Sequence, residues 1–199
     1  MATPRLTFHP ATPGRWPDVE ALFGKNGACA GCWCQFWKQS NAEYRAGKGA
    51  ANRAALRRSV KRGELPGVLA YQGGEPVGWV AVEPRARFKR LASSRNLPVI
   101  DARPTWSIPC FFVARGWRRR GVAGRLLAAA VAHARTRGAP AAEGYPVDSG
   151  RPMAGPWLYP GAFSTFVKAG FTEVLRKART RPVVRLELSR RGRARARSR

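Results

Sequence analysis

The segment from Trp106 to Gly138 constrains the fold most, because it joins an apolar run, an arginine-glycine turn and a long helical pattern. The run "WSIPCFFVA" is too short for a helix and rich in aromatic residues, so it predicts a central strand. After "GWRRR", the stretch "GVAGRLLAAAVAHARTRG" places apolar residues at helical spacing and ends at Gly138, a glycine typical of a helix stop. A strand, a glycine turn and a helix in succession indicate an α/β chain.

Shorter elements are expected on both sides of this unit. "GVLAYQGGEPVGWVAVEP" is the clearest, with two apolar runs joined by a glycine turn that predict a β-hairpin. The patterns also predict a strand over 5–10, helices over 15–23 and Asn41 to Arg62, a strand in "APAAEGYPVD", a short helix in "FSTFVKAGF" and two final strands over 173–188. Their order predicts one α/β domain over residues 1–188, with a mixed sheet flanked by helices.

The charge of the chain is strongly unbalanced. Lys and Arg number 37 against 11 Asp and Glu, giving a net charge of +26. The last eleven residues, 189–199, contain six arginines and too few apolar residues to fold, so a basic disordered tail is expected there. The remaining residues still carry +20. This excess indicates either a solvated basic surface or a polyanionic partner, namely the phosphates of a cofactor, RNA or DNA.

Two further patterns limit the location and the chemistry. The first residues contain no apolar signal region, and no run of about eighteen apolar residues could span a membrane, so a cytoplasmic protein without a membrane partner is expected. The cysteines Cys29, Cys32 and Cys34 form "CAGCWC", and Cys110 stands apart. A closed zinc site needs four ligands, and no second Cys/His pair lies nearby, so free thiols and no metal are expected.

The arginine-glycine turn has the properties of a phosphate cradle. The N–H groups at a helix start lack partners, the helix dipole adds positive character, and Gly121 allows a phosphate to approach the main chain. Neighbouring arginines add charge. The turn has neither the "GK[ST]" of a Walker A loop nor a "GxGxxG" dinucleotide fingerprint.

This turn resembles the pyrophosphate-binding signature of the GNAT superfamily of N-acyltransferases. That signature is Arg or Gln, two residues, Gly, one residue, then Gly or Ala, and Arg118, Gly121 and Ala123 match it. "FVKAGF" and "EPVGWVAV" resemble two further segments of the family, so that the similarity extends from about Leu6 to Leu188. The resemblance implies a mostly antiparallel sheet with a V-shaped opening between two central strands.

The resemblance also implies an acyl-coenzyme A donor, acetyl-CoA above all, in that opening. Its pantetheine would pair with the main chain of Phe111, Phe112 and Val113. Its pyrophosphate would rest on Arg118, Arg119, Arg120, Gly121, Val122, Ala123 and Gly124. An acceptor amine would attack the thioester from the other side, which requires removal of a proton from the amine and return of a proton to the thiolate.

The proton-transfer groups depart from the family pattern. Phe166 stands where many members carry a tyrosine general acid, and "WSIPCFFV" lacks the glutamate that some use as base. Glu143, Tyr145 and Asp148 are the nearest candidates, and Glu143 and Tyr145 are favoured because their spacing places them on one face of a strand. The alternative is that neither is catalytic and that Glu143 is a structural ion-pair partner.

Four residues are predicted to contact the acceptor, namely Trp33, Phe36, Trp106 and Asp148. Core packing is the alternative for the aromatic ones.

The sequence therefore favours an acyltransferase that forms an amide from acetyl-CoA, or a related acyl-CoA, and an amine of a small molecule or peptide. A second hypothesis keeps the fold and takes the acyl group from aminoacyl-tRNA, since the basic surface exceeds what coenzyme A requires. A third is a non-catalytic, nucleic-acid-binding module, for which the cationic helix around Arg57 would be a contact surface. The sequence indicates neither the acceptor nor the oligomeric state.

Overall fold

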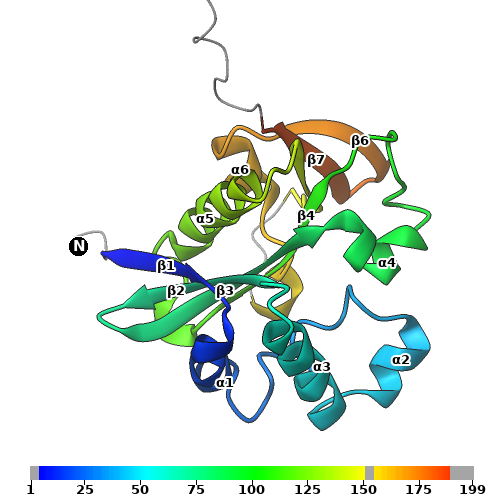
Figure 1. Cartoon of the computed structure of the whole chain (residues 1–199). Coiled ribbons are helices and arrows are strands. Elements are labelled where there is room, and N and C mark those ends of the chain that lie inside the picture. Colours follow the sequence, from blue (N-terminus) through cyan, green and yellow to red (C-terminus); the bar gives the residue numbers. More distant parts are fainter. Residues whose placement is uncertain (1–4, 151–154, 189–199) are drawn as a thin grey trace, which may run out of the picture.

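Seven strands form one mixed sheet in the order β1-β2-β3-β4-β5-β7-β6 (Figure 1). The structure is a computed structural model that describes residues 5–150 and 155–188. The strands are β1 Leu6–Pro10, β2 Gly67–Gln72, β3 Glu75–Pro84, β4 Trp106–Val113, β5 Ala141–Gly144, β6 Thr172–Ala178 and β7 Arg181–Glu187. The α-helices are α1 Trp16–Phe23, α2 Asn41–Ala46, α3 Ala50–Lys61, α4 Lys89–Ala92, α5 Val122–Thr136 and α6 Phe163–Lys168. The expected single α/β domain is confirmed, while the predicted disordered tail, 189–199, lies outside the described residues.

The predicted helix over 41–62 is wrong in one respect, because it consists of two helices. α2 ends at Ala46 and α3 begins at Ala50, with Gly47 and Gly49 between them. Gly49 has φ +82°, a left-handed conformation that interrupts a right-handed helix and that glycine adopts at little cost. The chain therefore turns between α2 and α3, a break that helical periodicity alone does not reveal.

The sheet opens between β4 and β5, its only parallel neighbours among the described strands. These two strands pair only from Trp106 to Ile108 on β4. The next residue, Pro109, has no N–H to offer a neighbouring strand. The β3–β4 register also shifts between Ala81 and Glu83, which indicates a bulge beside the same point. The C-terminal half of β4 therefore diverges from β5, as the V-shaped opening requires.

Helices cover both faces of the sheet, and the sheet separates two hydrophobic cores (Figure 1). On one face, α5 buries an apolar stripe that includes Leu126, Leu127 and Ala130. On the other, α1 and α3 pack with the aromatic residues of the loop between α1 and α2. The arginine-glycine turn lies on the face of the sheet that α5 covers, whereas Tyr145 belongs to the core on the face that α1 and α3 cover.

Candidate functional site

The turn between β4 and α5 has the geometry of an anion cradle. After β4 the chain makes a short 3-10 turn, Arg115–Trp117, and then reaches Gly121 immediately before α5. Gly121 has φ +73° and ψ 4°, and a Cβ placed on it would meet nothing within 4 Å. Glycine is therefore needed here for its left-handed backbone, which leaves open space above the main chain.

Within the described part of the chain, neither a capping side chain nor an acidic residue compensates the positive N-terminus of α5. No side chain caps it, and its first turn contains no acidic residue. The amide of Arg125 donates to the carbonyl oxygen of Gly121 at 3.3 Å, so the N–H groups of Val122, Ala123 and Gly124 come before the first helical hydrogen bond. At its N-terminus, this fifteen-residue helix presents amides without helical partners and the positive end of its dipole. Both favour a bound anion.

Three exposed arginines, Arg118 to Arg120, come immediately before Gly121 and these amides in the chain. Arg118 donates through Nε to the carbonyl oxygen of Val113 at 3.0 Å, which ties the turn to the end of β4. The guanidinium of Arg120 lies 5.2 Å from the centre of the Trp117 ring, while Arg119 has φ +61°. No described acidic side chain pairs with any of the three. The predicted pyrophosphate residues therefore lie together, with their charges available, and they fit such a group.

The predicted pantetheine segment forms the edge of β4 that borders the opening. The amide of Phe111 donates to the carbonyl oxygen of Tyr159 across an N–O distance of 2.6 Å. The Phe112 ring lies on the other core, 5.6 Å from Phe23. Sequence reasoning missed Tyr159, which belongs to a Pro/Gly-rich stretch interpreted only as a loop; its apolar "WLY" was the available signal.

The structure brings Glu143 and Tyr145 together. The Tyr145 hydroxyl donates to Glu143 Oε2 at 3.1 Å and lies 2.7 Å from Ser107 Oγ, and Arg85 Nη1 donates to it at 2.6 Å. Tyr145 is fully buried. Burial raises its pKa, with the Glu143 carboxylate adding to the effect, so the phenol stays protonated.

Glu143 is also an ion-pair partner, which is the alternative that its sequence context left open. Its Oε1 accepts from Arg185 Nη2 at 2.7 Å, and its Oε2 lies 3.5 Å from Arg85 Nη1. Asp101 binds the other side of the Arg185 guanidinium at 2.6 Å. A buried carboxylate needs such partners, so this network accounts for Glu143 structurally. Its role in proton transfer, and that of Tyr145, stays a prediction.

The four predicted acceptor residues do not form one cluster. Trp33 is buried and stacked on Trp16 with 6.1 Å between ring centres. Phe36 lies 5.8 Å from the Tyr159 ring and so stands close to the opening. Trp106 packs on the opposite face, 6.0 Å from His133 of α5.

The contacts of Asp148 are with other parts of the chain than those of the three aromatic residues. Its carboxylate pairs with Arg176 of β6 at 2.8 Å, and its amide donates to the carbonyl oxygen of Thr180. Among the four predicted residues, Phe36 has the surroundings that best suit an acceptor contact.

The cysteines of the chain are free thiols. Cys34 and Cys110 are buried with 3.7 Å between their sulfur atoms, and the hydrogen bond between them together with burial raises the Cys34 pKa well above its ordinary value. Within 5–150 and 155–188, no three His, Cys, Asp or Glu side chains are grouped so as to hold a metal ion. None of the helices in those ranges is both long and apolar enough to cross a bilayer.

Solved structures of several acetyltransferases resemble this fold. An acetyltransferase of the GNAT family from Listeria monocytogenes superposes with a TM-score of 0.54 at 11% identity, covering 92% of this chain and 95% of that one. The PaiA N-acetyltransferase from Thermoplasma acidophilum, solved in complex with coenzyme A, gives 0.53 at 9% identity, with 92% and 99% covered. A GCN5-related N-acetyltransferase from Kribbella flavida matches at 14% identity and a TM-score of 0.48, but this chain spans only 34% of that longer one. No curated protein sequence matches significantly.

The sequence comparison is more specific than these superpositions. The profile of the acetyltransferase (GNAT) family matches residues 33–144, which is more than half of the chain. That range contains the second half of the loop before α2, the central hairpin, β4, the arginine-glycine turn and α5. With the opened sheet and the anion cradle described above, the chain belongs to the GNAT family of acetyltransferases.

Proposed function

We propose that this protein transfers an acetyl group, or a related acyl group, from coenzyme A to an amine of a small molecule or peptide. The observation that carries the proposal is the arginine-glycine turn, which combines the first amides of α5, the open space over Gly121 and three arginines that pair with no described acid. Because the turn directly follows β4, a ligand whose phosphates rest on it can extend along the strand edge toward Phe111. Coenzyme A has that shape, with a diphosphate at one end and a thioester at the other.

The chain contributes binding and orientation to such a reaction. The amides of Val122 to Gly124 and the guanidinium groups would hold the diphosphate, while the edge of β4 would align the pantetheine. The bound donor supplies the acyl thioester that the amine attacks. Of the groups described, the protonated Tyr145 phenol is a candidate for returning a proton to the thiolate, and Glu143 for accepting one. Their buried partners leave this assignment as a proposal to be tested.

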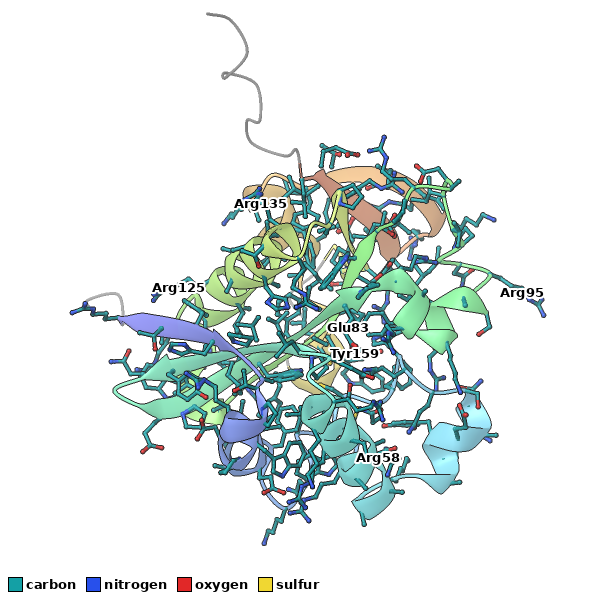
Figure 2. All side chains as sticks on the ribbon, viewed as in Figure 1. Arg58, Glu83, Arg95, Arg125, Arg135 and Tyr159 are labelled. Atoms are coloured by element: carbon teal, nitrogen blue, oxygen red, sulfur yellow. The ribbon has the colours of Figure 1, made fainter. Side chains whose placement is uncertain are left out.

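Coenzyme binding is tested first, by calorimetry with coenzyme A and two matched variants. Arg120→Gln removes a charge from the turn, whereas Arg135→Gln removes an exposed charge from the far end of α5 (Figure 2). Because a charge-assisted phosphate contact contributes about 1.5–3 kcal/mol, Arg120→Gln should weaken binding about tenfold or more. Arg135→Gln should leave it within about twofold. Failure of the native protein to bind coenzyme A would rule out the proposed donor.

Turnover is tested next with labelled acetyl-CoA and a panel of amines. A second candidate function, transfer from aminoacyl-tRNA, is favoured by the net charge of +26 and by exposed cations such as Arg57 and Lys61 on α3. A parallel reaction with labelled aminoacyl-tRNA separates the two donors, since RNase would abolish product formation only in the second. Salt-sensitive RNA binding without turnover of either donor would instead favour a non-catalytic nucleic-acid-binding module.

A further inference from the structure

A second polar pocket lies on the α3 side of the molecule and shares no lining residue with the arginine-glycine turn. Its volume is about 350 Å³. It is formed by the loop before α2, the C-terminal half of α3, the residues that follow α3 and the 3-10 turn Arg85–Arg87. The polar side chains that carry the argument are Lys38, Gln39, Arg58, Arg62, Glu64 and Arg87. Four of these six are cations and one is an anion.

One lining residue of this pocket, Lys38, belongs to a largely buried ion pair. Lys38 Nζ lies 2.7 Å from Glu83 Oε2, and the two side chains are only 15% and 3% exposed. Lys38 also donates to Ser59 Oγ at 3.4 Å. Glu83 comes from the end of β3 and does not line the pocket, and its charge is matched by Lys38. This pair contributes little net charge to the pocket.

Glu64 is matched in the same way by the cations beside it. Its Oε1 lies 2.9 Å from Arg62 Nε and 3.6 Å from Arg87 Nη1, so two guanidinium groups share one carboxylate. Arg58 pairs with no acid among the described residues, and its exposed side chain lines the pocket (Figure 2). After these pairings, two positive charges of the lining have no counter-charge within the described chain.

A polar atom of the lining also lacks a partner. Gln39 Oε1 is buried and makes no hydrogen bond with the described residues. A buried amide oxygen without a partner is costly, so a ligand toward which the Gln39 side chain turned would relieve that cost. Since the oxygen and nitrogen ends of a glutamine amide exchange by a half-turn of the side chain, this position can accept from a ligand or donate to an anion.

We infer that this pocket binds a small molecule that carries two negative charges, as a phosphate monoester or a dicarboxylate does. The two unmatched cationic charges set the charge of the ligand, and Arg58, Arg62 and Arg87 offer the forked donors that suit phosphate and carboxylate oxygens. The volume lies within the range typical of small-molecule sites and exceeds what a single ion needs. This site is distinct from the coenzyme cradle and does not depend on the proposed acyl transfer.

The test titrates the full-length protein with two probes, inorganic phosphate and succinate, by calorimetry at low ionic strength. Each titration is done with and without saturating coenzyme A, because an anion that rests in the arginine-glycine turn would be displaced by the coenzyme. Arg58→Gln is the test variant, since this side chain is exposed and forms no ion pair with the described residues. Arg57→Gln is the matched control, because it removes a neighbouring exposed charge of α3 that does not line the pocket.

Saturable binding of at least one probe is expected, unchanged by coenzyme A. Arg58→Gln should weaken it about tenfold, the effect of one lost charge-assisted contact, and Arg57→Gln should leave it within about twofold. Phosphate binding alone would identify the dianion as a phosphate monoester, and succinate binding alone as a dicarboxylate. Three results would overturn the inference: no saturable binding of either probe, displacement by coenzyme A, or equal effects of the two variants.

Discussion

The amide of Phe111, on the β4 side of the opening, donates to the carbonyl oxygen of Tyr159 across an N–O distance of 2.6 Å. That amide belongs to the segment where the family resemblance places the pantetheine of the donor. A carbonyl of the chain thus takes the position that a carbonyl of the pantetheine would need. We infer that donor binding exchanges the Tyr159 contact for a coenzyme contact.

This exchange predicts a localised spectroscopic change when coenzyme A is added. The ¹⁵N-bound amide signal of Phe111 should shift strongly, because its hydrogen-bond acceptor changes, whereas the buried Leu69 of β2 should not respond. Nuclear magnetic resonance titration measures both signals in one sample. A Phe111 signal that stays in place while the coenzyme binds elsewhere would show that the pantetheine follows another path.

Gly121 and Gly116 form a matched pair for testing the cradle. A Cβ meets nothing within 4 Å at either position, but only Gly121 has a positive φ, at +73°. Gly121→Ala should therefore lower the free energy of unfolding by about 1–2 kcal/mol and weaken coenzyme A binding about tenfold as the turn relaxes. Gly116→Ala should change neither by a measurable amount. Urea unfolding and calorimetry check the pair, and equal behaviour would disprove a backbone role for Gly121.

The ion-pair network predicts a large stability loss at Glu143. Glu143→Gln leaves Arg185 and Arg85 facing a neutral amide in a buried site, which should lower the free energy of unfolding by about 3 kcal/mol. Glu187→Gln is the control, since the exposed pair of Glu187 with Arg103 should contribute at most about 1 kcal/mol. Equal losses in urea unfolding would contradict the buried network.

The same region allows the catalytic assignment to be separated from stability. Tyr145→Phe removes only a hydroxyl, and it should lower the free energy of unfolding by about 1–2 kcal/mol because Arg85 and Ser107 lose a partner. If Tyr145 returns the proton to the thiolate, kcat of the folded variant should also fall by about 10²–10⁴-fold. An unchanged kcat in this variant and in Glu143→Gln would remove both residues from the mechanism.

The contact between Glu43 of α2 and Lys89 of α4 is expected to weaken in acid. The hydrogen bond from Lys89 and those from Ser40 lower its pKa from 4.5 to about 2. Because the folded pKa is depressed, the stabilisation is fully present above pH 4.5 and disappears as the pH falls through about 2. Carbon-detected titration of the Glu43 carboxylate checks the value, and Lys89→Met should move it toward 4.5. A native pKa near 4.5 would contradict the contact.

Local patterns predicted several elements well, for reasons visible in particular residues. The "QGGEP" turn required a hairpin because Gly73 and Gly74 both adopt positive φ. The stripe containing Leu126 and Leu127 required a helix that packs on a sheet, and it does. Periodicity did not predict the break between α2 and α3, because the Ala and Arg residues on both sides favour helix equally and only the backbone of Gly49 reverses the chain.

The sequence by itself determined the arginine-glycine turn, because Arg118, Gly121 and Ala123 act through local backbone geometry at the start of one helix. Only the tertiary structure decided the partners of Glu143, since Arg85 and Arg185 reach it from segments far apart in the chain. It alone also revealed the approach of Tyr159 to Phe111 and the basic pocket around Arg58. Such contacts depend on how the folded sheet brings distant segments together, and no local pattern of residues encodes that distance.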